Sequence, residues 1–249
     1  MYPGIDTGAK KAWFFFDDEV VCLGAGIQST STEEVFTTVN QCLLLEEKVI
    51  LSTGKNKDLS PAWVLHNEVG YFFPKGGKVF VENQLQTGSW YDINHSAPNK
   101  IEEKEVFTIG FNHGKNPSNA DYAYIVVPGK QTAKEMKEYQ RTNSIEILSN
   151  TEKVQVVRNK KLGIWQMVFY EPGEFKNKDI TVKVDRSCSL MIKDVNRHET
   201  SLHIADPGRT HSTVKMSIYM PGKYNIAKEL DCDFRESGIY AGGTKAKIF

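Results

Sequence analysis

Short apolar segments separated by turn-forming residues run through nearly the whole chain of 249 residues. In PAWVLHNEVGYFFPKGGKVFVENQ, residues 61–84, apolar runs are separated by Asn67-Glu68, Pro74 and Gly76-Gly77. Glycine tolerates a positive φ angle and proline cannot donate to a strand ladder, so these residues interrupt strands. Many short strands with regular turns are typical of antiparallel sandwiches. We therefore predict an all-β fold.

One helix is predicted among the strands. Thr132 is followed three residues later by Glu135, which is the spacing of a capping box, and AKEMKEYQR continues with good helix formers. The helix is expected to connect two β units, and we place the domain boundary so that the domains are residues 1–146 and 147–249. The tail from residue 231 is expected to add one edge strand. The first predicted strands are residues 11–16, 19–23, 34–40, 41–45 and 48–52.

The acidic residues of KAWFFFDDEV, residues 11–20, allow two interpretations. They form either a catalytic carboxylate cluster or the tip of a hairpin between two apolar strands. A working acid and base pair needs environments that separate the two pKa values, and adjacent turn residues face the same solvent. Two-residue turn geometry accounts for Asp17-Asp18 without chemistry. We therefore predict a hairpin tip.

The balance of charge excludes some functions. The chain has 31 basic and 31 acidic side chains, which argues against a general nucleic-acid binder with a basic face. Residues 1–150 carry 14 basic and 19 acidic side chains, and residues 151–249 carry 17 basic and 12 acidic side chains. The weak positive charge of the second part would help to hold a polyanion, but ordinary solvent-exposed faces explain it equally well. No segment reaches the roughly 18 consecutive apolar residues of a membrane helix, and the N-terminus lacks the features of a signal peptide.

Common catalytic and metal-binding motifs are absent from the sequence. The six histidines lack metal-ligand spacing, although His203 and His211 flank a turn and would be the best pair for a metal. The four cysteines include no C-x-x-C pair, and Cys22 and Cys42 lie in apolar runs typical of buried thiols. Because no phosphate loop, dinucleotide fingerprint or nucleophile elbow is present, we expect neither a metal nor a cofactor.

The segment TGSWYDINHS, residues 87–96, is the most site-like. Trp90 and Tyr91 would stack on a sugar ring while Asn94 and His95 bond its hydroxyl groups, because carbohydrate sites join an aromatic plate to planar polar groups. The alternative is that Trp90 is a core aromatic and Asn94 a turn former. A second group, Arg158, Lys160 and Lys161, is a candidate for binding the acidic groups of a glycosaminoglycan.

Several segments taken together resemble a known family. KAWFFFDDEVVCLGAGI, VFTTVNQCLL, AWVLHNEVGYFF, GSWYDIN, FNHG and YAYIVVPG are similar, in order, to the β region of polysaccharide lyase family 8, which includes chondroitin AC and ABC, hyaluronate and xanthan lyases. NTEKVQVV and the strands after it resemble the small C-terminal domain of these enzymes. The resemblance implies an antiparallel β supersandwich followed by a smaller β sandwich.

The resemblance also implies a reaction and its location. Family members cleave uronic-acid-containing polysaccharides by β-elimination, which needs neutralisation of the carboxylate, a base for the C5 proton and an acid for the leaving oxygen. In the family an Asn, a His, a Tyr and an Arg on an N-terminal α/α toroid do this, with a Glu at the start of the β region. None can be carried over, and neither Glu19 nor Glu33 matches that Glu.

These implications lead to the expected function. We expect the β portion of such a lyase, inactive alone, whose partners are an acidic polysaccharide and a toroid domain supplied upstream or by a separate chain. The family implies an extracellular or periplasmic location. An alternative is a stand-alone carbohydrate-binding module for acidic polysaccharides. A complete enzyme with an improvised site of Tyr and His residues is a third hypothesis.

Overall fold

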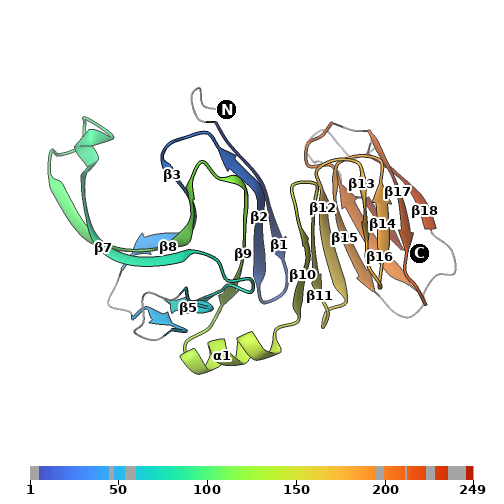
Figure 1. Ribbon diagram of the computed structural model, residues 1–249, viewed down its shortest axis with the longest axis horizontal. Coiled ribbons are helices and arrows are strands. Elements are labelled where there is room, and N and C mark those ends of the chain that lie inside the picture. The colour runs from blue at the N-terminus through green and yellow to red at the C-terminus, as the bar shows by residue number, and fades with distance from the viewer. Residues whose placement is uncertain are drawn as a thin grey trace. The chain divides into compact units, whose positions relative to one another are not determined.

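The computed structural model describes residues 6–44, 48–53, 60–194, 199–210, 212–222, 228–234 and, as a strand only, 245–248. The chain divides into two compact units. Unit 1 comprises residues 1–9, 17–22 and 26–141, and unit 2 comprises residues 10–16, 23–25 and 142–249. Figure 1 shows that strands dominate the described part of the chain and that the helix α1 (Ala133–Thr142) interrupts them. The predicted all-β class is therefore confirmed.

Two antiparallel sheets contain the first nine strands. The six-stranded sheet has the order β1 (Thr7–Phe15), β2 (Val20–Ser29), β9 (Ser118–Pro128), β6 (Val69–Phe72), β5 (Trp63–His66) and β4 (Ile50–Leu51). The three-stranded sheet has the order β3 (Glu34–Leu43), β8 (Ile101–Lys115) and β7 (Val79–Ser89). Val64, Phe107 and Ile109 are fully buried in the core that joins the two sheets. Burial of these alternating residues is the main source of sandwich stability.

Local turn chemistry explains the hairpin of β5 and β6. Asn67 and Glu68 have φ angles of 48° and 58°, and His66 pairs with Val69 across them. Two positive φ angles characterise the type I′ turn, whose twist matches that of paired strands. The predicted turn is therefore confirmed.

Strand β3 differs from its prediction. Residues 34–43 form one strand instead of two, and its register against β8 shifts between Thr38 and Asn40. A bulge of this kind inserts a residue without ending the strand, which breaks the alternation of apolar and polar residues.

The helix α1 (Ala133–Thr142) has the predicted capping box. The Glu135 N–H donates to Thr132 Oγ1 over 3.2 Å, and the Thr132 N–H donates to Glu135 Oε2 over 2.8 Å. These bonds satisfy two of the helix's unpaired N–H groups. Met136 lies fully buried beneath the helix, beside Gly70 in β6. In the part of the chain that the structure describes, no helix is long and apolar enough to cross a membrane.

The contact between Gly70 and Met136 gives a stability prediction. A Cβ atom on Gly70 would overlap the Met136 sulfur, so Gly70→Ala should lower the free energy of unfolding by about 1–3 kcal/mol through overpacking. Gly88→Ala is the matched control, because a Cβ there meets no atom within 4 Å. Urea denaturation followed by circular dichroism measures both variants. Equal effects would show that α1 does not pack closely on β6.

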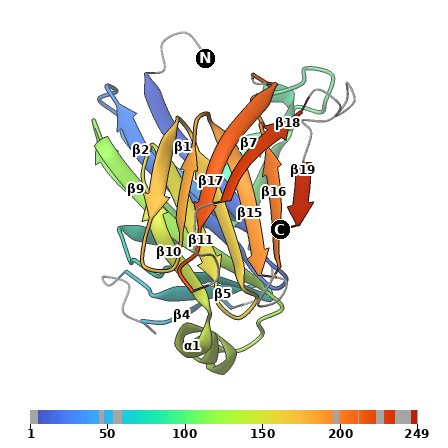
Figure 2. The ribbon, with the colours of Figure 1, turned by 90° about the vertical axis from the view of Figure 1, so that its right-hand side faces the viewer.

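Unit 2 contains two further antiparallel sheets. The six-stranded sheet has the order β10 (Ile145–Asn150), β11 (Val154–Asn159), β12 (Ile164–Phe169), β15 (Cys188–Asp194), β16 (Thr200–Ala205) and β19 (Lys245–Ile248). The four-stranded sheet has the order β13 (Gly173–Lys176), β14 (Thr181–Val184), β17 (Thr213–Tyr219) and β18 (Lys228–Asp233). Figure 2 shows several of these strands from the front. The tail supplies the edge strand β19, as predicted.

The core of unit 2 is continuous between its sheets. Trp165, Ile192 and Leu202 face it from one sheet, and Val182 and Val214 from the other. The two sheets thus form a second sandwich, which confirms the predicted order of a larger and then a smaller β unit with one helix between them.

All four cysteines are free thiols. Cys22 is buried as predicted, and burial raises the pKa of its thiol to about 11. Cys42 is only half-buried, so its prediction as a buried thiol is wrong. Its strand β3 turns this residue towards the rim of the core, where Cys42 Sγ lies 3.9 Å from His66 Nδ1.

Candidate functional site

The candidate carbohydrate site lies at the end of the longest hairpin of unit 1. Strands β7 and β8 pair from Val79–Phe111 to Ser89–Ile101, and Figure 1 shows them as two long curved strands joined by a loop. The loop begins with a short 3₁₀ helix, η1 (Trp90–Asp92). The Tyr91 N–H donates to Ser89 Oγ over 3.2 Å, so a serine N-cap sets the direction of η1.

The structure brings Trp90, Tyr91, Asn94 and His95 together in this loop. The Trp90 side chain is 67% exposed, so the alternative that it is a core aromatic is wrong. The rings of Tyr91 and His95 lie 4.8 Å apart at 60°. Asn94 accepts a hydrogen bond from the Ser96 N–H through Oδ1 over 3.0 Å, so it also serves as a turn former.

The loop has the components of a saccharide platform. Trp90 offers an indole face to solvent, and the neighbouring Ile93 and Ile101 are 80% and 70% exposed. Aromatic faces stack on the C–H surfaces of sugars, while amide and imidazole groups bond hydroxyls. The four residues lie within one loop, and their binding role stays a prediction.

The predicted basic group lies on the hairpin of β11 and β12 in unit 2. The Arg158 side chain is 23% exposed, and its Nη1 lies 3.0 Å from Asp179 Oδ2. Its guanidinium also lies over the Trp165 ring, 4.4 Å from the ring centre. Lys160 pairs with Glu146 over 3.2 Å, whereas Lys161 is exposed. These contacts give Arg158 a structural role, and binding of substrate by the three residues stays a prediction.

The acidic residues connect two neighbouring strands as predicted, but the connection is longer than a two-residue turn, because β1 ends at Phe15 and β2 begins at Val20. Asp17 and Asp18 are exposed between β1 and β2. Glu19 is only 9% exposed, and its carboxylate accepts a hydrogen bond from the Tyr139 hydroxyl on α1. The expectation that all three acids face solvent is therefore wrong for Glu19. Burial and the bond to Glu19 raise the pKa of Tyr139, so this pair holds its proton on the phenol.

The histidines that the structure describes are engaged inside their own units. His66 is buried and stacks on Phe107 with ring centres 4.2 Å apart. His113 Nε2 lies 2.9 Å from Thr37 Oγ1, and His203 Nε2 lies 2.9 Å from Ser201 Oγ. The proposed partner of His203, His211, lies outside the described residues. Within those residues, no group of three or more His, Cys, Asp or Glu side chains is placed to hold a metal.

A cavity of about 320 Å³ in unit 1 was not predicted from the sequence. Lys75 and Lys78 line it from one turn, and Asn112, His113 and Asp121 line it from β8 and β9. Two lysines against one aspartate give the lining an excess of positive charge, which suits an acidic ligand. The signal in the sequence was KGGK, because paired lysines around a glycine turn project from one short loop, but their partners in β8 and β9 are distant in the chain.

Comparisons with known proteins agree with this architecture. The model for "Polysaccharide lyase family 8, super-sandwich domain" matches residues 2–140, and that for "Polysaccharide lyase family 8, C-terminal beta-sandwich domain" matches residues 146–215. Chondroitinase-AC of Pedobacter heparinus is 38% identical over 95% of this chain and 34% of its own length. A hyaluronate lyase of Thermasporomyces composti is 32% identical over 85% of this chain and 28% of its own length.

Solved structures show the same relation. A chondroitinase AC lyase structure, described with enzyme–oligosaccharide complexes, superimposes with a TM-score of 0.88 at 35% identity. It covers 99% of this chain, which in turn covers 37% of that chain. The chain thus spans about a third of the length of the relatives it matches. With both of its domain models matched in order, the chain belongs to polysaccharide lyase family 8.

Proposed function

We propose that this chain supplies the β region of a lyase that cleaves uronic-acid-containing polysaccharides, of the chondroitin sulfate or hyaluronan type, by β-elimination. The observation that carries the proposal is the 38% identity with chondroitinase-AC over 95% of the chain. Similarity of this extent spans both β domains, which we assign to residues 1–146 and 147–249. Hyaluronate lyase relatives support the same class of substrate.

We further propose that the 249-residue polypeptide does not perform the elimination alone. The reaction needs a base for the C5 proton and an acid for the leaving oxygen within reach of one sugar. Glu19 is bonded to Tyr139, and His66 is buried against Phe107, so neither is presented to a polymer. The relatives have about two thirds of their length outside the matched part, and we assign the acid and base to a toroid domain there.

The β region is then a substrate-holding part of the enzyme. Trp90 and the Tyr91–His95 pair would contact sugar rings, and Lys161 and the cavity lysines Lys75 and Lys78 would attract carboxylate or sulfate groups. An extracellular or periplasmic location follows from this substrate, because polymeric glycosaminoglycans occur outside the cytoplasm.

A stand-alone binding module for acidic polysaccharides is the second candidate. The observation that favours it is the 67% exposure of Trp90 at the end of a long hairpin. Both a binding module and a lyase β region would use Trp90 to contact a sugar ring. Only the lyase β region needs a catalytic domain joined to it.

Turnover and binding by the purified 249-residue polypeptide test the proposal together. Mixed with chondroitin sulfate or hyaluronan, it should bind the polymer in calorimetry and should produce no rise in the ultraviolet absorbance of unsaturated uronides. Robust product formation would overturn the assignment of the acid and base to another domain. Absence of binding to either polymer would count against a substrate-holding role.

A further inference from the structure

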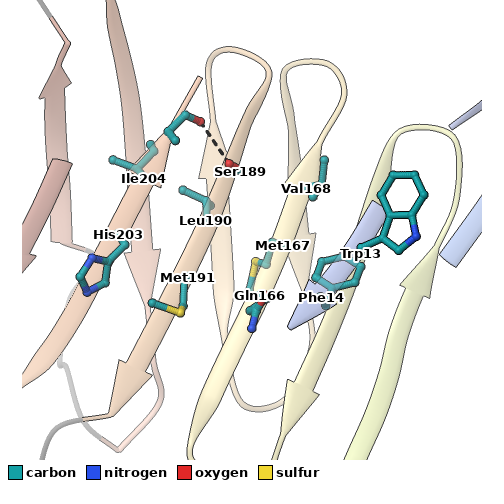
Figure 3. A pocket seen from close by; sticks show the side chains of 11 residues that line it. Trp13, Phe14, Gln166, Met167, Val168, Ser189, Leu190, Met191, His203 and Ile204 are labelled. Atoms are coloured by element: carbon teal, nitrogen blue, oxygen red, sulfur yellow. Dashed lines mark hydrogen bonds between the residues drawn. The ribbon is translucent and has the colours of Figure 1, made fainter. Parts of the chain in front are cut away.

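A groove of about 280 Å³ crosses the outer face of the six-stranded sheet in unit 2. Figure 3 shows it lying over three neighbouring strands, β12, β15 and β16, with Trp13 and Phe14 of β1 at one end. The strand register explains the hollow. Gln166, Met191 and His203 form one row of long side chains across the strands. The next row consists of shorter side chains: Val168, Ser189 and Ala205.

One wall of the groove is held in place by a hydrogen bond between distant parts of the chain. Gln166 Nε2 donates to the Phe15 carbonyl oxygen over 2.7 Å, which fixes β1 beside β12. Phe14 is 2% exposed there, whereas Trp13 is 54% exposed. An indole ring that stays half-exposed beside a groove lacks part of the hydrophobic stabilisation that full burial would provide. Trp13 is thus available to a ligand.

The polar atoms around the groove suit a sugar. Because Nε2 of Gln166 is used by Phe15, its Oε1 is left as an acceptor for a hydroxyl. His203 contacts Ser201 through Nε2, which leaves Nδ1 as a second hydrogen-bonding atom. Met191 lies between these two groups and offers an apolar floor. An aromatic plate, an apolar floor and two planar polar groups are the usual components of a saccharide site.

A positive charge lies on the same face of the sheet. Lys193 follows Met191 by two residues on β15, so both side chains point to the outer face, and Lys193 is exposed. Lys193 pairs with Ile164 and Ser201, so it lies in the row next to that of Gln166, Met191 and His203. A carboxylate or sulfate on a sugar in the groove would therefore meet a cation.

We propose that this groove is a second saccharide-binding site, in unit 2, which takes one or two sugar units of an acidic polysaccharide. Trp13 stacks on a sugar ring, Gln166 and His203 bond its hydroxyls, and Lys193 pairs with its acidic group. The choice of ligand rests on the proposed function, whereas the position of the site rests on the geometry of unit 2. Such a site would keep a long polymer on the enzyme between cleavage events.

Tryptophan fluorescence gives a direct test in the whole 249-residue chain. Trp63 and Trp165 are 2% and 1% exposed, so in a Trp90→Phe variant Trp13 is the single tryptophan accessible to a quencher. A chondroitin tetrasaccharide should protect this fluorescence from acrylamide. Trp90→Phe/Lys193→Gln should bind it about tenfold more weakly, because one charge-assisted contact is lost. Phe15→Ala, which removes a 68% exposed aromatic from the same strand, is the matched control and should leave protection unchanged.

The outcomes separate this proposal from the proposed function. Absence of protection in Trp90→Phe, while the wild-type chain binds the tetrasaccharide, would overturn the groove and leave the lyase assignment standing. Protection that is insensitive to Lys193→Gln, or that a neutral maltotetraose produces equally well, would overturn the acidic ligand. Protection by the acidic tetrasaccharide, together with no product from a folded enzyme in which this chain is joined to a lyase catalytic domain, would support the groove and contradict the lyase assignment.

Discussion

Replacing Arg158 with glutamine is expected to lower the free energy of unfolding by about 1–2 kcal/mol, the largest stability effect among the candidate site residues. The substitution removes the ion pair with Asp179, in which the two atoms lie 3.0 Å apart, and the stacking over Trp165. The Arg158 and Asp179 side chains are 23% and 39% exposed, so solvent screening weakens the ion pair and the stacking on Trp165 contributes a comparable part of the effect. Denaturant unfolding, with fluorescence of the buried Trp165 as the probe, measures the change.

Lys161→Gln is the matched control for Arg158→Gln. Lys161 lies on the same hairpin and is exposed, so its loss should change stability by no more than about 0.5 kcal/mol. If both variants have the same denaturant midpoint as the wild-type chain, Arg158 has no structural role. That result would support the prediction that Arg158 binds substrate.

Trp90→Ala is expected to weaken binding of chondroitin sulfate by about tenfold or more without changing stability. The expected loss reflects removal of the aromatic plate, and the unchanged stability follows from a side chain that is already 67% exposed. Titration calorimetry at constant ionic strength measures the affinity, since salt alone alters the binding of polyanions.

Leu85→Ala on the same hairpin is the control for Trp90→Ala. Leu85 is 60% exposed on β7 and is apolar, but it offers no ring for stacking. Equal weakening by both substitutions would mean that the hairpin binds through general apolar contact. An unchanged affinity in Trp90→Ala would remove the hairpin end from the substrate-binding surface.

Features set by neighbouring residues could be predicted from the sequence. The turn at Asn67-Glu68 and the capping box of Thr132 and Glu135 depend on backbone preferences within four residues, and both are present. The order of a larger and then a smaller β unit was also predictable, because several short sequence motifs occur in this chain in the same order as in the family.

Features set by distant contacts could not be predicted. Glu19 is buried because Tyr139 on α1 bonds it, although the two are 120 residues apart. The groove beside Trp13 depends on the register of three strands and on Gln166, 151 residues beyond Phe15. From the sequence alone, Trp90 could be either a core aromatic or a ligand contact. The length of the β7 and β8 hairpin places it in solvent, and that length depends on strand pairing.

A hybrid enzyme tests whether this chain is the β region of a polysaccharide lyase. In the hybrid, this chain replaces the matching third of Pedobacter heparinus chondroitinase-AC, to which it is 38% identical. A second hybrid that carries the same region of the Thermasporomyces composti hyaluronate lyase serves as the control, at 32% identity to this chain. The measurement is the ultraviolet absorbance of unsaturated uronides formed from chondroitin. If this chain is a lyase β region, the folded hybrid should form product. A folded hybrid that forms no product, while the control hybrid forms it, would show that this chain does not serve as the β region of such a lyase.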